Sequence, residues 1–317
     1  MTRDEYNQVC VEKLKQLRLE ERVAVVGSGL SYRLTKRVDD LAKTLEGPCR
    51  VNKGVEEPNW DFFDRAHDAN SKEYYRVVKE SFSQTLPLDA RLYWHIAKIR
   101  FKSFVTLNFD DQMPSAFHKT RLNRADVLFK VYPGHGCIYL PSDLTGEKQH
   151  LVAVHGYKND NIPDWHEKLI LRGKDYDLHY VGDDNSRPPF LYLWWYWLLT
   201  TVPCVFIGTS LREPGLATVI VQILKSGNQK IKDLHIHLKE TDSQPPNYTE
   251  SEERSLGVIQ QVLYDKFDED HAGLGRVLSS FSGEPEGSPV PLDDAEVFTI
   301  KDNLTFLKSY GGQSQQG

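Results

Sequence analysis

Short runs of apolar residues recur along the chain, and most of them stop abruptly at a glycine or a polar residue. Each run has about the length of one buried strand, and segments with apolar residues at helical spacing lie between the runs. This alternation predicts an α/β fold, with a Rossmann-like parallel sheet flanked by helices. The predicted strands are Val23–Val26, Phe104–Leu107, Val127–Val131, Leu151–Val154, Cys204–Ile207 and Leu234–Leu238.

The longest block with helical spacing covers residues 58–100, and it predicts a helical insertion between two strands. We expect one domain over residues 1–280 that includes this insertion. Residues 281–317 contain loops rich in proline, serine and acidic residues, so we expect a loop-rich C-terminal segment with a disordered end. The other predicted helices lie in segments 4–21, Val38–Leu45 and Leu216–Leu224.

The most apolar stretch, Phe190–Gly208, has about the length of a membrane-spanning helix. Pro203 interrupts it, and two threonines precede the proline. A buried aromatic helix followed by a buried strand at Cys204–Ile207 explains this composition better than a membrane segment does. We therefore expect no membrane association, and we expect the aromatic residues to lie in the core or in a subunit interface.

Composition and charge narrow the classes of protein further. The net charge of −6 provides no general attraction to nucleic acids or anionic membranes, so no nucleic-acid partner is expected. The four cysteines are scattered and form no Cys-x-x-Cys pair, which predicts reduced thiols, a cytoplasmic location and no zinc module. His235 and His237 alternate on a predicted strand without a carboxylate or cysteine at ligand spacing, so no metal site is predicted.

Polar clusters that contain glycine or asparagine follow four of the predicted strands, at the ends where open α/β sheets bind ligands. In the first cluster, Gly27-Ser28-Gly29-Leu30-Ser31, the glycines would let the backbone approach a phosphate. It lacks the third glycine of the dinucleotide motif and the Gly-Lys-Ser/Thr ending of a P-loop, so alone it also fits a tight strand-to-helix turn. The other clusters are Thr106-Leu107-Asn108-Phe109-Asp110, His155-Gly156 and Gly208-Thr209-Ser210-Leu211.

In this order the four clusters resemble the sirtuin family, whose signature runs Gly-x-Gly-x-Ser, Thr-Gln-Asn-x-Asp, His-Gly and Gly-Thr-Ser-Leu. The resemblance covers residues 20–280 in motif order, although only about twenty positions carry it. It implies that NAD⁺ is bound as a substrate. The residues implied in binding it are Gly27, Ser28, Gly29 and Ser31 at the pyrophosphate, and Gly208, Thr209 and Ser210 on the adenosine side.

The departures from the sirtuin pattern change the implied activity. Sirtuin deacylases carry a four-cysteine zinc module and a Gly-Ile-Pro-Asp-Phe-Arg stretch. This chain has no such cysteines, has residues Tyr32–Arg37 in place of that stretch, and has Leu107 in place of the glutamine. It is similar instead to the zinc-free sirtuin-like NAD⁺ hydrolases of bacterial anti-phage systems, whose segment after the histidine resembles Leu169–Tyr176. The resemblance therefore implies an NAD⁺ glycohydrolase that serves as a defence effector.

The candidate catalytic residues are His155, Asn108 and Asp110. Cleavage of the nicotinamide–ribose bond leaves positive charge on the sugar, so the site must position a water and supply a base. His155 suits the base because imidazole titrates near neutrality. Asn108 can hold ribose hydroxyls or water, and Asp110 can orient a neighbour or stabilise the positive charge. His135 also precedes a glycine, but it follows a Pro-Gly turn rather than a strand, and Asn108 and Asp110 also fit as helix caps.

Two alternatives remain open at this point: an NAD-dependent protein deacylase, and a non-catalytic module that binds NAD⁺ or ADP-ribose. No sensor domain is apparent after residue 240. We therefore expect activation by a separate sensor protein or by homo-oligomerisation.

Overall fold

The computed structural model describes a seven-stranded sheet in which every neighbouring pair of strands is parallel. The strand order is β3-β4-β2-β1-β5-β6-β7, which confirms the predicted Rossmann-like α/β fold. The strands are β1 (Val23–Val26), β2 (Ser103–Thr106), β3 (Phe129–Tyr132), β4 (Gln149–Ala153), β5 (Cys204–Ile207), β6 (Ile236–Glu240) and β7 (Gln260–Tyr264). The described residues are 3–30, 38–83, 91–121, 129–132, 149–181, 189–209, 211, 213–226, 235–240, 260–264 and 272–282.

The central strands are apolar because both of their faces are buried. In β1, Ala24 and Val26 pack into one hydrophobic cluster, whereas Val23 and Val25 pack into another on the opposite face. Side chains alternate across a strand, so a run of four apolar residues supplies two to each face. β1 pairs in register with β2 on one side and β5 on the other.

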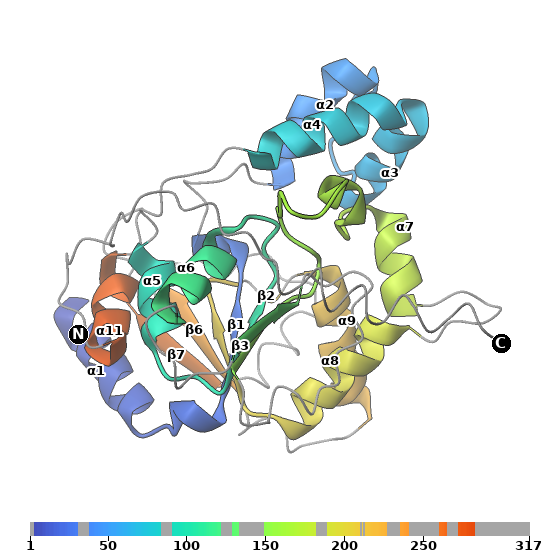
Figure 1. Ribbon diagram of the computed structural model, residues 1–317. Coiled ribbons are helices and arrows are strands. Elements are labelled where there is room, and N and C mark those ends of the chain that lie inside the picture. The colour runs from blue at the N-terminus through green and yellow to red at the C-terminus, as the bar shows by residue number, and fades with distance from the viewer. Residues whose placement is uncertain are drawn as a thin grey trace, which may run out of the picture.

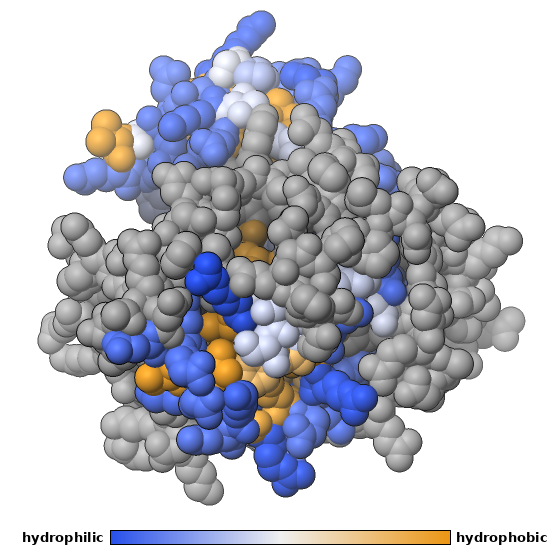
Figure 2. Space-filling model, turned by 90° about the vertical axis from the view of Figure 1, so that its left-hand side faces the viewer, coloured by the Kyte–Doolittle hydropathy of each residue, from blue (hydrophilic) through white to orange (hydrophobic). Residues whose placement is uncertain are grey.

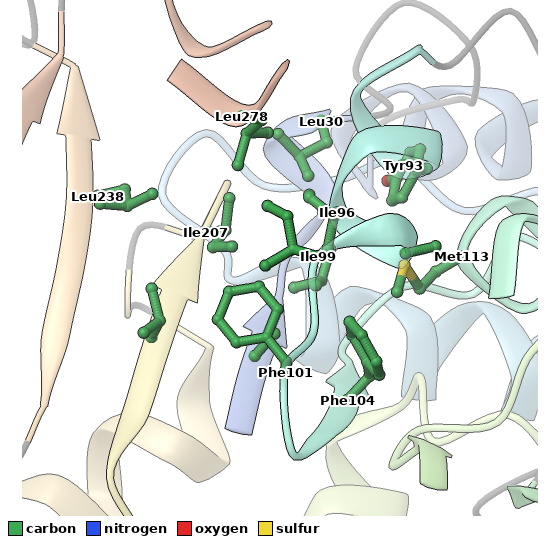
Figure 3. Close-up of a cluster of buried hydrophobic side chains, with 14 of the residues drawn as sticks. Leu30, Tyr93, Ile96, Ile99, Phe101, Phe104, Met113, Ile207, Leu238 and Leu278 are labelled. Atoms are coloured by element: carbon green, nitrogen blue, oxygen red, sulfur yellow. The ribbon is translucent and has the colours of Figure 1, made fainter. Parts of the chain in front are cut away.

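Four helices cover the face of the sheet to which Ala24 and Val26 point, and two of them come from the ends of the described chain (Figure 1). Figure 3 shows the hydrophobic core between these helices and the sheet, in which Ile96 and Ile99 lie beside Phe104 of β2 and Ile207 of β5. The amphipathic helix α5 also places Tyr93 in this cluster. The helices are α1 (Arg3–Lys15), α5 (Arg91–Lys98), α6 (Gln112–Arg121) and α11 (Ala272–Ser282).

Two helices, α8 (Phe190–Thr201) and α9 (Pro214–Lys225), pack on the opposite face of the sheet. Trp194, Trp195 and Leu198 of α8 are buried there, so part of the aromatic run belongs to the core as expected. α8 ends before Pro203, which precedes β5. Within the described part of the chain, no helix combines the length and the apolar character needed to cross a membrane.

Three further helices form a unit that stands apart from the sheet in Figure 1. They pack around a third hydrophobic cluster, which also includes Phe109 after β2 and Trp165 after β4. This helical unit consists of α2 (Val38–Cys49), α3 (Asn59–Ala69) and α4 (Ser71–Ser83). α5 also lies within block 58–100, but it packs against α6 and α11 instead of the unit. Figure 2 shows mostly hydrophilic residues on the outside of the unit, at the top of that view.

The helical unit contacts the segment that follows β4. Asp64 of α3 accepts a backbone hydrogen bond from Lys174 at 3.0 Å, and the ring of Trp60 lies 5.0 Å from that of Tyr176. Tyr176 ends the short helix α7 (Gly173–Tyr176), and a π-helical turn over Asp177–Val181 follows directly. This contact joins the helical unit to the tyrosine-bearing segment on which the site described next depends.

Candidate functional site

The four polar clusters predicted to bind ligand follow four strands that lie side by side. Gly27 follows β1, Asn108 lies just after β2, His155 just after β4 and Gly208 directly after β5. Since the order of these strands is β4-β2-β1-β5, all four clusters meet at the carboxyl edge of one parallel sheet. The predicted residues Ser31 and Ser210, and the alternative His135, lie outside the described residues.

The two glycine clusters contact each other where the order of the strands reverses. The Gly29 N–H donates to the Gly208 carbonyl at 2.8 Å, and the Gly27 N–H donates to Ile207 at 2.9 Å. A Cβ atom on Gly27 would lie 2.5 Å from Cβ of Thr209, and one on Gly29 would lie 2.7 Å from the Gly208 oxygen. Contact between the loops therefore requires both glycines, and both of these N–H groups already have backbone acceptors.

Gly208 is required for a second reason. Its φ is +64°, which L side chains rarely adopt, and a Cβ there would meet the side chain of Leu30. Thr209 continues the loop, and its carbonyl accepts a hydrogen bond from Nε2 of His237 at 2.7 Å. The predicted adenosine-side loop is thus fixed from both neighbouring strands.

Asn108 is buried, with 1% of its surface exposed, and lies just beyond the end of β2. Its Nδ2 donates to the hydroxyl of Tyr93 at 2.6 Å, and its backbone N–H donates to Oγ1 of Thr106 at 3.2 Å. The other amide atom, Oδ1, has no hydrogen-bond partner among the described residues. A buried acceptor without a partner costs about 1–3 kcal/mol, so a ligand that supplies a donor would stabilise this oxygen.

Asp110 has the capping role that the sequence left open. Its Oδ1 accepts a hydrogen bond from the backbone N–H of Gln112, the first residue of α6, at 3.0 Å. Such a bond satisfies a helix N–H group that has no partner within the helix. The contact accounts for an aspartate here, while the predicted role in catalysis stays a prediction.

A buried lysine, Lys158, pairs with two more exposed carboxylates next to the Asn108 segment. Nζ of Lys158 is 3.4 Å from Asp111 and 3.5 Å from Asp160, while the Lys158 backbone N–H donates to the carbonyl of Phe109 at 2.8 Å. Burial raises the pKa of Asp111, and the lysine charge opposes that shift. The segments that follow β2 and β4 are therefore joined by both charge and backbone contacts.

His155 is almost completely buried, at 1% exposure. Its Nε2 lies 3.1 Å from the hydroxyl of Tyr180, which also accepts a hydrogen bond from Nε1 of Trp195 at 3.1 Å. A hydrogen bond between the ring and the backbone of Leu107 favours the protonated form. If Nδ1–H donates that bond, Nε2 is left to accept from Tyr180. Burial nevertheless dominates and lowers the pKa of His155, so the ring favours the neutral form that a base requires.

The carboxylate beside His155 could not be expected from the sequence pattern. Oε1 of Glu213 lies 3.5 Å from Nε2 of His155, and the glutamate is half-buried. Pro214 at the first position of α9 is a signal for a helix start, but glutamate is not a preferred residue before it. No sequence signal indicated Tyr93 or Tyr180 either, because only the folded chain brings these tyrosines next to Asn108 and His155.

The two alternating histidines have structural partners in the described chain. His235 accepts a hydrogen bond from the backbone of Cys204 at Nδ1, at 3.1 Å, and its Nε2 lies 2.8 Å from the Leu199 carbonyl. His235 thus links β5, β6 and α8 through both of its ring nitrogens.

A group of possible metal ligands in the described part of the chain consists of Asp164, His166 and Glu167, on a turn beside α4.

We expect acid to destabilise the protein through His235. Burial lowers its pKa to about 4, against an ordinary value of 6.5. Above pH 6.5 neither state binds the proton; between about pH 6.5 and 4 only the unfolded chain does, so stability falls by on the order of 3 kcal/mol. Urea unfolding at pH 7, 5.5 and 4.5 should show a shallower loss in His235→Gln than in the wild type. Because His155 remains in both proteins, equal slopes would contradict this role for His235.

The parallel sheet, with glycine loops that face each other where the strand order reverses, defines a Rossmann-like α/β domain. The model of the SIR2-like domain family matches residues 102–259. The chain therefore contains a SIR2-like domain, a class that binds NAD⁺. The matched range includes Asn108, His155 and Glu213, and begins after Gly27 and Gly29. No curated protein matches the chain.

Proposed function

We propose that the protein is an NAD⁺ glycohydrolase, which cleaves NAD⁺ to nicotinamide and ADP-ribose. The observation that carries this proposal is the buried Asn108, held by Tyr93 with its Oδ1 unpaired. A hydroxyl of the nicotinamide ribose, or the attacking water, is a donor that would satisfy this oxygen. Just after β4, the strand next to β2, His155 supplies a neutral imidazole.

In the proposed reaction, the bond between the ribose C1′ and the nicotinamide nitrogen breaks, and nicotinamide leaves as a neutral molecule. Water forms the new bond to C1′ and loses one proton. His155 accepts that proton at Nε2, which is the nitrogen that faces Tyr180. Asn108 orients the ribose or the water, and the loops that begin at Gly27 and Gly208 position the rest of the dinucleotide.

Hydrolysis is favoured over deacylation by the residues that replace the deacylase motifs. The chain lacks the four-cysteine module, and residues Tyr32–Arg37 follow the glycine loop where deacylases have Gly-Ile-Pro-Asp-Phe-Arg. Cys10, Cys49 and Cys204 are buried free thiols, and Cys137 lies outside the described residues. We further propose that the enzyme acts as an anti-phage effector, activated by a sensor protein or by homo-oligomerisation in the cytoplasm.

Incubation of the full chain with NAD⁺ tests this function. We expect equal amounts of nicotinamide and ADP-ribose, measured by chromatography over a range of protein concentrations, with His155→Ala as the inactive control. Native mass analysis of the same samples, with and without NAD⁺, would relate turnover to oligomeric state. Parallel reactions with an acetyl-lysine peptide separate the alternatives, because deacetylation requires the peptide and hydrolysis does not.

The opposite results are equally clear. NAD⁺ or ADP-ribose that binds tightly but is never cleaved, together with unchanged NAD⁺ levels in cells overproducing the chain, would indicate a non-catalytic binding module. Products that appear only with the acetylated peptide would indicate a deacylase. Either result would overturn the hydrolase proposal.

A further inference from the structure

Glu213 occupies a position that joins a helix terminus to the candidate base. Its carboxylate accepts backbone hydrogen bonds from Gly215 at 3.1 Å and Leu216 at 2.5 Å, in the first turn of α9. The hydroxyl of Tyr176 also hydrogen-bonds to it. The N-terminus of a helix favours negative charge, and these donors fix the carboxylate beside the ring of His155.

The surroundings of His155 make this carboxylate its one charged neighbour within ion-pair distance in the described chain. The titratable groups that face the ring are Tyr176 from α7, Tyr180 from the π-helical turn and Glu213 from the start of α9. The ring of Phe109, 6.1 Å away, is the neighbour from the β2 side. A proton placed on Nε2 would therefore lie between the hydroxyl of Tyr180 and the Glu213 carboxylate.

Close packing between the start of α9 and Tyr180 holds Glu213 and Tyr180 next to each other. A Cβ on Gly215 would lie 2.2 Å from the Tyr180 ring, so the first turn of α9 packs directly on the tyrosine that contacts His155. Glu213 and Tyr180 are thus held together by the same helix start. Neither the cap nor this packing needs the glutamate side chain to reach the imidazole, because a shorter aspartate caps helices at least as well.

We propose that Glu213 is a positioning residue for His155, whose carboxylate stabilises the imidazolium formed when Nε2 takes up the proton. The proposal rests on the proposed function only for the source of that proton. In this proposal, the start of α9 contributes to the reaction because it fixes the carboxylate that faces the base. Tyr176 and the two backbone N–H groups serve to orient the carboxylate.

Titration of His155 by nuclear magnetic resonance, in the full chain with ¹⁵N-labelled histidine, tests the proposal without NAD⁺. In Glu213→Gln the charge is lost, so the charged imidazole is less favoured and the pKa of His155 should fall by about one unit. Glu213→Asp keeps the charge and the cap but withdraws the carboxylate, so it should also lower the pKa. Glu80→Gln, an exposed change on α4 with the same loss of charge, should leave the His155 titration unchanged.

Turnover supplies the second readout. In Glu213→Gln, kcat at pH 7 should fall about tenfold, with a smaller change in KM, and the acidic limb of the pH profile should move to lower pH. A role limited to capping predicts instead that Glu213→Asp equals the wild type in both measurements. That result, or a His155 signal that titrates identically in all variants, would overturn the proposal. Absence of NAD⁺ cleavage by the wild type, both as the pure chain and in phage-infected cells that contain its activator, would contradict the proposed function alone, because the titration still reports on Glu213.

Discussion

Replacement of His155 by alanine is expected to reduce NAD⁺ turnover by about 10² to 10⁴-fold. The reason is that the substitution removes the neutral imidazole that accepts the proton of the attacking water. The burial of the ring makes replacement by bulk water inefficient, since 1% of this residue is exposed. Initial rates of nicotinamide release at saturating NAD⁺, compared with the wild type at pH 7, measure the effect.

The fold has to be monitored in the same experiment, because His155 also has structural contacts. Loss of its ring leaves the Tyr180 hydroxyl without one partner, at a cost of about 1–3 kcal/mol. His155→Gln keeps most of the volume and one polar group, so it should unfold closer to the wild type while remaining inactive. Turnover at the wild-type rate in a folded His155→Gln protein would exclude His155 as the base.

The sheet could be predicted from the sequence because its central strands are buried on both faces. Such strands appear as uninterrupted apolar runs, as at Val23–Val26 and Cys204–Ile207, and the polar residues after them mark the carboxyl edge. β7, with the sequence Gln-Gln-Val-Leu-Tyr, lies at the edge of the sheet and has no such run. The pattern therefore predicted the strands that position the site more readily than the strand farthest from it.

The candidate site was less predictable, because its second set of residues comes from distant segments. Tyr93 of α5 hydrogen-bonds to Asn108, and Glu213 contacts His155 although 58 positions separate them in the sequence. A tyrosine in an amphipathic helix and a glutamate before a proline carry no chemical signal in isolation. The glycines show a different limitation: the sequence indicated a close approach at Gly27 and Gly29, but the neighbour that the structure shows is the Gly208 loop.

Asn108→Ala is expected to lower kcat by about 100-fold, with a smaller change in KM. The carboxamide positions the reacting ribose or water, whereas most contacts with the dinucleotide would come from other loops. Binding of ADP-ribose, measured by calorimetry, should therefore persist in the variant. Tyr93→Phe provides the matched test, because it removes the hydroxyl that accepts from Nδ2 and leaves the Asn108 side chain in place.

The two variants together test whether the unpaired Oδ1 of Asn108 binds the substrate. If the oxygen binds a donor of the substrate, Tyr93→Phe should lose less activity than Asn108→Ala. The tyrosine variant removes one hydrogen bond that orients the amide, but it keeps the acceptor itself. If the oxygen is only a local cost of folding, Asn108→Ala should retain turnover, because no group of the substrate then depends on the carboxamide. That second result would remove the observation on which the proposed function rests, whatever the role of His155.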